Sequence, residues 1–475
     1  METTTSSRPV LGPDASGRVA PGKKVHLVSL GCPKNRVDSE VMVGKLLNAA
    51  FQLVDDPADA EIIVVNTCSF IQPATEESID TVLEMAGYKE TGRCEKLVVT
   101  GCMVQRYGRT LEAELPEVDA FLGTGEYHRI TEVLQSRSAE APKSYVDVPL
   151  YLHDELAPRV NSWSRASAYL KISEGCDHRC AFCIIPTLRG KLRSRTIPSL
   201  VTEARRLADE GVVELNLISQ DSTAYGRDLG DGSGLGPLLQ ALSEIDSVRW
   251  IRLHYAYPHG LPTGLLEQLA GNPKVVKYLD IPLQHASGSM LRAMRRGVTR
   301  EGQERILDRV RAAVPDISLR TTFIVGFPGE TDADFAELCD FVRASKFDHV
   351  GVFTYFAEEG TPAATLPDQV ADEVKTARQA ELMEIQRQIS RSKLARLVGT
   401  SQVVLVERRS EESELLWQAR LPTQAPDVDG VVFVTEPEPG PDGKPSIDIA
   451  PGAFVRVEIT QAADHDLVGE PLERV

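Results

Sequence analysis

The sequence has no long hydrophobic run. No apolar stretch among its 475 residues approaches the roughly 18–20 residues that a membrane-spanning helix needs. Its beginning, METTTSSRPVLGPDASGRVAPG, holds no apolar segment followed by a cleavage-type pattern, and is interpreted as a disordered tail rather than a signal peptide. The sequence therefore predicts a cytoplasmic protein with no membrane partner.

Basic residues are also scarce. Lys and Arg number 52 against 69 Asp and Glu, which gives a formal net charge of −17. The imbalance is concentrated in residues 401–475, which hold 15 acidic and 6 basic side chains. Such a balance disfavours a partner that is itself a polyanion, because affinity for nucleic acid depends on Lys and Arg contacts to phosphates.

Cysteines are few, and their spacing is informative. In a large cytosolic protein thiols stay reduced, so spaced cysteines indicate metal binding or catalysis rather than disulfides. Three of the eight end short apolar runs: KVHLVSLGC ends at Cys32, AEIIVVNTC at Cys68 and KLVVTGC at Cys102. The runs are continuous rather than alternating, as in buried parallel strands, and helical patterns separate them.

These runs predict an α/β domain with a parallel sheet. Ligands of such sheets gather beyond the carboxyl ends of the strands, where the three cysteines are expected to converge. The alternative is that each cysteine is a small buried hydrophobic residue that caps its strand. Three cysteines at the same structural position favour a role as ligands.

A second series of strands and helices begins near residue 165. Its six βα units predict a partial, open (β/α)6 barrel, with its chemistry at the carboxyl ends of the strands. The last 70 or so residues are rich in short strands and in Gly and Pro turns, which predicts a small antiparallel β-barrel. The expected organisation is a disordered tail at 1–22, an α/β domain at 23–140, a linker at 141–164, the partial barrel at 165–398 and the small barrel at 399–470.

The loop after the first barrel strand holds Cys176, Cys180 and Cys183 in a C-x3-C-x2-C pattern. A zinc site with His178 as fourth ligand is one reading, although no second Cys or His pair follows at a suitable spacing. A thioredoxin-like motif would leave Cys176 unexplained. A 4Fe–4S cube held by three thiolates has one open iron, which S-adenosylmethionine occupies in enzymes that cleave it to a radical.

The chain resembles the radical-SAM methylthiotransferases from about residue 24 to 470. The resemblance implies an N-terminal methylthiotransferase domain, a radical-SAM barrel and a C-terminal TRAM barrel. It also implies that Cys32, Cys68 and Cys102 bind a second 4Fe–4S cluster that delivers sulfur. In this family S-adenosylmethionine supplies both the methyl group and the radical, and an external donor supplies the electron.

Other candidate residues are less distinctive. In IVGFPGET, the loop bearing Gly326, Pro328 and Gly329 is where family members contact adenine or ribose, although it is equally interpreted as a turn that ends a strand. Gln220 and Asp221 follow the second barrel strand and are candidates for binding the methionyl end of the cofactor.

Two further stretches have a functional and a structural reading. Gln284 and His285 are candidates to face the substrate, with a satisfied buried histidine as the alternative. The basic run LRGKLRSR, residues 188–195, is either a steering site for anions or a solvated face. Cys339 is expected in a helix core.

Two branches of the family differ in substrate. SLGCPKNRVDSE, LISQDSTAYGRD and IPLQHAS resemble the RimO type, which modifies the β-carbon of an aspartate in small-subunit ribosomal protein twelve. The alternative is a MiaB-type enzyme that modifies a tRNA adenosine. The acidic C-terminal barrel favours a basic protein over tRNA, unless its acidity reflects only a solubility bias of the host. A non-catalytic iron–sulfur or zinc protein that binds RNA or the ribosome is the rival from another class.

Overall fold

The structure is a computed structural model that describes residues 22–136, 142–437 and 447–475. The predicted disordered tail, apart from Gly22, lies outside these residues. The chain divides into two compact units. The first contains the residues up to Ser162 together with Lys171–Arg179 and Cys183–Arg195, and the second contains Trp163–Leu170, Cys180–Phe182 and Thr196–Val475.

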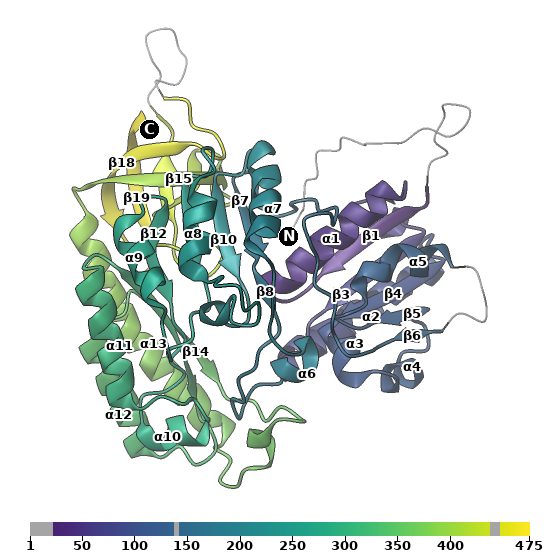
Figure 1. The fold of residues 1–475 in the computed structure, drawn as a ribbon, viewed down its shortest axis with the longest axis horizontal. Helices are drawn as coiled ribbons and strands as arrows, with labels where there is room; N and C mark the ends of the chain where they lie inside the picture. Colours follow the sequence, from purple (N-terminus) through teal and green to yellow (C-terminus); the bar gives the residue numbers. More distant parts are fainter. Residues whose placement is uncertain (1–21, 137–141, 438–446) are drawn as a thin grey trace. The chain divides into compact units, whose positions relative to one another are not determined.

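The first unit is built on a six-stranded sheet with strand order β2-β1-β3-β4-β5-β6, and its strand pairs are parallel (Figure 1). The three strands expected from the sequence are its centre. The strands are β1 (Lys24–Ser29), β2 (Gln52–Leu53), β3 (Ile62–Thr67), β4 (Lys96–Gly101), β5 (Ala120–Leu122) and β6 (Ser144–Tyr145). The helices are α1 (Pro33–Asn48), α2 (Gln72–Thr91), α3 (Cys102–Tyr107), α4 (Thr110–Glu114) and α5 (Ile130–Gln135).

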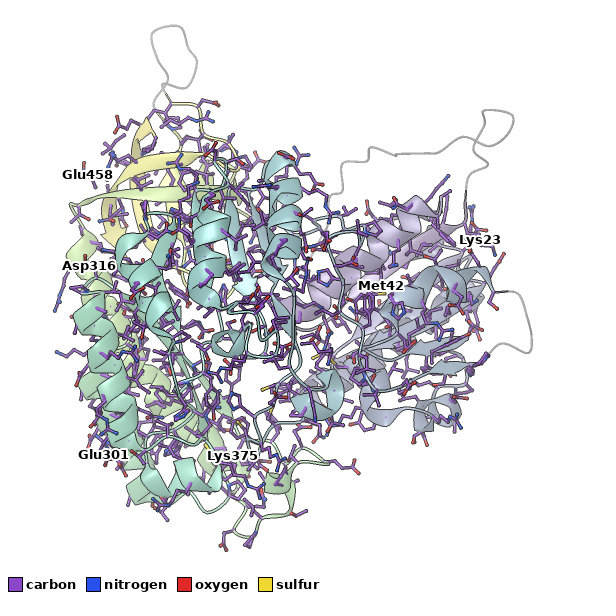
Figure 2. All side chains as sticks on the ribbon, in the orientation of Figure 1. Lys23, Met42, Glu301, Asp316, Lys375 and Glu458 are labelled. Carbon is purple, nitrogen blue, oxygen red and sulfur yellow. The ribbon has the colours of Figure 1, made fainter. Side chains whose placement is uncertain are left out.

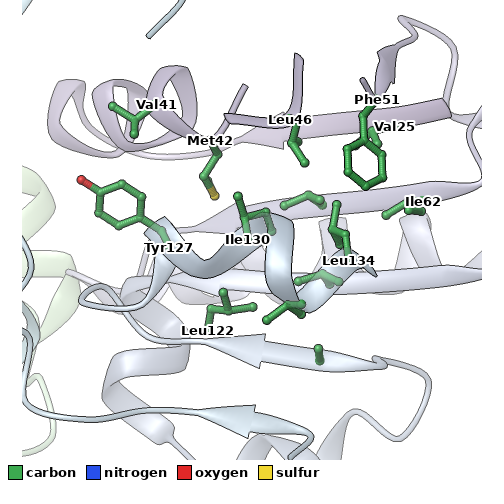
Figure 3. Close-up of a cluster of buried hydrophobic side chains, with 14 of the residues drawn as sticks. Val25, Val41, Met42, Leu46, Phe51, Ile62, Leu122, Tyr127, Ile130 and Leu134 are labelled. Carbon is green, nitrogen blue, oxygen red and sulfur yellow. The ribbon is translucent and has the colours of Figure 1, made fainter. Parts of the chain in front are cut away.

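Both faces of this sheet are covered, which explains the continuous apolar pattern of its strands. Successive residues of β3 point to opposite faces, so Ile62 packs with α1 and α5, whereas Ile63 packs with α2, α3 and α4. Figure 2 marks the contrast between exposed Lys23 and buried Met42 in this unit. Figure 3 shows Met42 and Leu134 against the sheet on the α1 and α5 side.

The second unit confirms the partial (β/α)6 barrel. Its sheet has the order β14-β13-β12-β11-β10-β7, with β7 and β14 as open edges. The strands are β7 (Ser167–Lys171), β10 (Glu214–Ile218), β11 (Trp250–Leu253), β12 (Val275–Asp280), β13 (Ser318–Val325) and β14 (His349–Thr354). The helices are α7 (Ile197–Asp209), α8 (Leu235–Ser243), α9 (Thr263–Gly271), α10 (Gly288–Ala293), α11 (Arg300–Ala313), α12 (Asp332–Ser345) and α13 (Asp372–Leu394).

The C-terminal barrel is closed, in the order β15-β16-β17-β19-β18. The strands are β15 (Ser401–Arg409), β16 (Leu416–Arg420), β17 (Val432–Thr435), β18 (Phe454–Ala462) and β19 (Leu467–Arg474). The predicted antiparallel pairing is present except between β17 and β19, which are parallel. An odd number of strands cannot alternate in direction all the way around a closed ring, so one parallel pair is required.

The small barrel packs on the edge of the second sheet where its strands begin. Trp250 and Tyr278 share a buried apolar cluster with Leu405 and Phe454. The carboxyl ends of the barrel strands, where the candidate site residues lie, are therefore the edge that the small barrel does not cover. Among the residues that the structure describes, no helix is long and apolar enough to cross a membrane.

Candidate iron–sulfur and S-adenosylmethionine site

The structure brings Cys32, Cys68 and Cys102 to the carboxyl ends of three neighbouring parallel strands. Cys32 follows β1 and precedes α1, Cys68 directly follows β3, and Cys102 begins α3 directly after β4. Because β1, β3 and β4 are adjacent in the sheet, their ends meet at one edge. The convergence predicted from the three apolar runs is therefore present.

Two glycines that precede these cysteines allow close approaches of the backbone to its neighbours. Gly31 has φ +85°, and a Cβ on it would lie 2.9 Å from the Sγ atom of Cys68. Gly101 has φ +101°, and its Cβ would lie 2.5 Å from both the side-chain oxygen of Asn66 and the carbonyl oxygen of Thr67. Only glycine adopts these backbone angles without strain or displacement of neighbours. Both glycines precede cysteines in the sequence, so the Gly-Cys pairs were a signal that the sequence reasoning missed.

Burial keeps two of the three thiols protonated when no metal is bound. It raises the pKa of Cys102 to about 12, against the nearby Arg189, and it raises the pKa of Cys68, to which the neighbouring Cys32 adds. Cys32 is exposed. A cationic inorganic cluster would offset this cost of ionising the buried thiols, so three cysteines at one sheet edge fit an iron–sulfur group.

Two residues beside Cys102 were not identified from the sequence as parts of this site. Buried Asn35, on α1, donates side-chain hydrogen bonds to the carbonyl oxygens of Leu30 and Thr67, at 3.0 and 2.9 Å. Arg189 ends α6 (Ile185–Arg189), and its guanidinium lies 3.6 Å from the Cys102 sulfur. Long-range contacts of this kind, across 87 residues for Arg189, leave no local pattern in the sequence.

Cys176, Cys180 and Cys183 lie in the segment between β8 (Ser173–Glu174) and α6, which follows the first barrel strand as predicted. The amide of Cys176 donates to the carbonyl oxygen of Gly190 at 3.0 Å. Cys180 is buried, and Arg296 donates to its sulfur at 3.3 Å. Sequence reasoning also missed Arg296.

The loop after β13 is organised by Glu330. Its Oε2 atom accepts the backbone amides of Gly326 and of Phe327, the latter at 3.1 Å, and Arg378 lies 3.2 Å from Oε1. Gly326 has φ +74°, and the position of a Cβ there is filled by the side chain of Lys375, which is labelled in Figure 2. Gly329 has φ +80° and open space where a Cβ would lie. Pro328 lies between them, as buried as Gly326.

Asp221, a predicted cofactor residue, and His285, a candidate to face the substrate, both have hydrogen-bond partners within the protein. Gln220 is half-buried, whereas Asp221 is buried and caps a short helix, where its Oδ1 atom accepts the amide and hydroxyl of Thr223 at 2.9 and 2.5 Å. His285 is fully buried, and its Nδ1 atom accepts the amide of Ser287 at 2.9 Å. Burial lowers the pKa of His285 to about 4, so its ring is neutral. Its Nε2 atom lies 3.9 Å from Glu330 and has no hydrogen-bond partner among the described residues, so this histidine is buried but not fully satisfied.

The basic run at 188–195 is not simply a solvated face. Arg189 and Arg195 are buried, and Arg195 lies 3.0 Å from the ring of His153. Lys191 is exposed.

Cys339 is buried on α12, as expected of a core residue. Among the described residues, no group of three His, Cys, Asp or Glu side chains is close enough to hold a single metal ion.

A cysteine-lined parallel sheet, a partial barrel with C-x3-C-x2-C after its first strand and a closed five-stranded barrel define a radical-SAM enzyme of three domains. Residues 24–123 match the family described as "Uncharacterized protein family UPF0004", residues 170–342 the radical SAM superfamily, and residues 398–472 the TRAM domain. Membership of the radical SAM superfamily entails a 4Fe–4S cluster and S-adenosylmethionine.

The chain belongs to the RimO family of ribosomal protein uS12 methylthiotransferases. It is 51% identical over 451 residues to the member from Anaeromyxobacter sp. (strain Fw109-5), covering 95% of this chain and 93% of that one. It is 49% identical to the member from Myxococcus xanthus (strain DK1622), covering 95% and 92%. The predicted resemblance and enzyme class are confirmed.

The fold is also similar to that of a solved radical S-adenosylmethionine methyltransferase, TsrM from Kitasatospora setae. The TM-score is 0.52 at 16% identity, over 70% of this chain and 73% of that chain. At this identity the similarity concerns the fold alone.

Proposed function

We propose that this chain is the methylthiotransferase that modifies ribosomal protein uS12 and adds a methylthio group to the β-carbon of an aspartate. The observation that carries the proposal is the identity of about half of all residues to RimO proteins over nearly the whole length of both chains. The reaction class suits the site, because no acid–base group can ionise an unactivated β C–H bond and a radical route is needed.

Each cysteine trio holds one 4Fe–4S cluster in this proposal, Cys176, Cys180 and Cys183 at the barrel and Cys32, Cys68 and Cys102 at the N-terminal sheet. Three thiolates rather than four leave one iron of each cluster for a ligand that is not protein. When bound, the clusters and S-adenosylmethionine supply the electron, the radical and the methylthio group. An external donor supplies the electron to the protein.

The loop after β13 binds the nucleoside part of S-adenosylmethionine. Glu330 holds the loop by accepting two of its backbone amides. Gly329, with open space beside its Cα atom, is favoured over Gly326 as the point where a ligand reaches the backbone. Gln220 and Asp221, after β10, lie at the strand end assigned to the methionyl part.

The acidic C-terminal barrel favours a protein substrate. Its exposed side chains include Glu412, Glu414, Glu458 and Glu470, which would repel RNA phosphates and attract a basic ribosomal protein. The proposed reaction takes place in the cytoplasm, where ribosomal proteins are made, and uses no tRNA.

The test is one anaerobic competition assay. Reconstituted protein receives S-adenosylmethionine, sulfide, a one-electron reductant, uS12 and unmodified tRNA together, and mass spectrometry scores both polymers. A methylthio group on the uS12 aspartate alone is expected. A methylthio group on tRNA would keep the radical chemistry and overturn the substrate.

Two cysteine variants test the division of labour. Cys180→Ala is expected to abolish cleavage of S-adenosylmethionine, because it removes a ligand of the radical-generating cluster. Cys68→Ala is expected to leave cleavage intact and to stop sulfur transfer. Loss of both functions in each variant, with normal iron at the other site, would contradict two separable clusters.

A further inference from the structure

Each cysteine trio has one buried sulfur that accepts a hydrogen bond from a buried arginine. Arg189 lies 3.6 Å from the Sγ atom of Cys102, and Arg296 lies 3.3 Å from that of Cys180. Both arginines are no more than 4% exposed, so their positive charges act on the sulfurs with little screening by water. The Cys102 S–H group also donates to the side-chain oxygen of Asn35 at 3.7 Å, as Cys94, which belongs to neither trio, donates to the carbonyl oxygen of Lys96 at 3.5 Å. The hydrogen bond from the arginine is therefore what distinguishes the Cys102 sulfur.

Arg189 is held by partners that fix its orientation. Its Nη1 atom donates to Asp38 at 2.6 Å and to Glu174 at 3.4 Å, and its Nη2 atom donates to Asn35 as well as to the Cys102 sulfur. Lys171 pairs with the same two carboxylates, with Asp38 at 2.5 Å and with Glu174 at 2.7 Å. The positive charges of Arg189 and Lys171 equal the negative charges of Asp38 and Glu174 in number. Loss of Arg189 would therefore leave an excess negative charge beside Cys102.

Arg296 is held in a different way but with the same result. Its Nη2 atom donates to the carbonyl oxygen of Pro282 at 2.7 Å, and its guanidinium lies 4.3 Å from the ring centre of Tyr257. The hydroxyl of Tyr257 donates to the carbonyl oxygen of Arg296 at 2.6 Å. Arg296 has no carboxylate among these partners, so the Cys180 sulfur, which is a thiolate when it ligates a cluster, would be the anion that it faces.

We propose that Arg189 and Arg296 are positioning residues that set the reduction potentials of the two clusters, Arg189 at the N-terminal trio and Arg296 at the radical-SAM trio. The Arg189 half rests on the proposed function, because it needs the second cluster. One-electron reduction, by an external one-electron donor, adds a negative charge to a cluster whose thiolates are already anionic. A charged donor to the sulfur stabilises that reduced form and raises the potential.

The arginine is the residue type that this role requires. A guanidinium stays protonated and presents several donors in a fixed fork, so it can bind a carboxylate or a carbonyl with one amino group and a sulfur with another. A lysine at the same place would keep the charge but could not hold both partners in this geometry.

The experiment is a redox titration of the full-length, reconstituted protein, followed by electron paramagnetic resonance. Each cluster is observed alone: Arg189 variants are made with Cys176, Cys180 and Cys183 changed to Ala, and Arg296 variants with Cys32, Cys68 and Cys102 changed to Ala. Arg189→Gln and Arg296→Gln are expected to lower the equilibrium constant for one-electron reduction at least about tenfold, equivalent to about 59 mV. The Lys variants are expected to give smaller decreases.

Two matched variants test whether loss of any buried arginine has this effect. Arg159→Gln removes a buried arginine that pairs with Glu40 at 2.6 Å, and Arg252→Gln removes one that pairs with Glu214 at 3.1 Å. Both variants are expected to leave the equilibrium constant for one-electron reduction within about twofold of that of the parent protein.

The outcomes separate the two proposals. Unchanged potentials in cluster-loaded Gln variants would overturn the inference and leave the proposed function intact. If a Gln variant loses its iron, the Lys variant decides, and an unchanged potential there overturns the inference. If the protein without Cys176, Cys180 and Cys183 binds no cluster, the two-cluster function and the Arg189 half fail together, whereas the Arg296 half is still measured separately.

Discussion

The site depends at the residue scale on positions that only one amino acid can occupy. Gly101 is the clearest case, because its φ of +101° and its two backbone contacts with Thr67 leave no space for a Cβ. The next residue is Cys102, so any shift of the backbone there moves a predicted ligand. Positive φ at the residue before a ligand thus couples the fold of the loop to the binding of the cluster.

Gly101→Ala is expected to lower the free energy of unfolding by about 2–3 kcal/mol and to reduce iron at the N-terminal site, because the backbone must shift. Gly108→Ala is the control. Gly108 has φ +54° but no heavy atom within 4 Å of the place that an alanine methyl group would take, so only about 1 kcal/mol of backbone strain is expected. Urea unfolding and iron analysis measure both, and equal iron loss in the two variants would contradict the argument.

His285 makes the stability of the second unit depend on pH. Its native pKa of about 4 lies below the value of about 6.5 for an unfolded chain, so the native state favours the neutral ring. The stabilisation is complete above pH 6.5 and is lost as the pH falls toward 4. Between pH 7 and 5 the wild type is expected to lose about 2 kcal/mol more than His285→Gln does.

Denaturant unfolding of the loaded protein at pH 7 and pH 5 measures this difference. His259→Gln, at an exposed position of the same unit, is the control. If the wild type and His285→Gln lose the same stability between pH 7 and pH 5, protonation of the buried His285 ring does not destabilise the native state.

The element scale shows how far the sequence could predict this fold. Long buried strands such as β3 and β13 were found because their apolar runs are continuous and bounded by turns. The strands β2, β5 and β6 were missed, since two or three residues carry no periodicity. β16 was missed because its Leu416–Arg420 segment is short and mixes polar Gln418 and Arg420 with apolar residues, so it forms no apolar run.

The site residues, like the strands, could be predicted only where the sequence carries a local pattern. The six cysteines carry local signals, either a C-x3-C-x2-C spacing or a position after an apolar run, and could be named in advance. Arg189 and Arg296 could not, because each reaches its sulfur from a distant part of the chain. For the basic run at 188–195 the sequence leaves both a steering site for anions and a solvated face open, and only the fold shows that Arg189 is buried against Asp38.

One buried ion group connects β10 of the partial barrel with β16 of the small barrel. Glu214 accepts from Arg420 at 2.5 Å, from Arg252 at 3.1 Å and from Ser167 at 2.7 Å, and all four side chains are buried. Burial acts to raise the pKa of Glu214, but Arg420 and Arg252 lower it to about 2. The carboxylate is therefore ionised and depends on both guanidinium groups.

Arg420→Met is expected to lower the free energy of unfolding by about 3–5 kcal/mol, because it leaves an incompletely paired charge in the interior. Glu214→Gln is expected to cost a similar amount, because it leaves both Arg252 and Arg420 without their shared carboxylate. The double variant is expected to lose less than the sum of the two single losses, because each change already removes the partner of the other. A double-mutant cycle in urea measures the coupling. Additive single effects would show that the small barrel is held by its apolar contacts alone.

The distribution of charge is a property of the whole molecule. The net charge is −17, and the last 75 residues contribute 15 acidic against 6 basic side chains. Fields of this kind act over about 8–10 Å at physiological ionic strength and affect the rate of association more than the final contacts. If uS12 is the substrate, the acidic barrel raises the rate at which uS12 associates with the enzyme and does not orient its aspartate.

Changing Glu412, Glu414, Glu458 and Glu470 to Lys is expected to lower kcat/KM for uS12 about tenfold at low salt, with kcat little changed. The difference is expected to shrink as salt is added, because the effect is long-range attraction. The matched control carries the same change of charge on exposed positions of α2, at Glu76, Glu77, Asp80 and Glu84. Equal losses in both variants would show that total charge, and not the acidic barrel, governs encounter with the substrate.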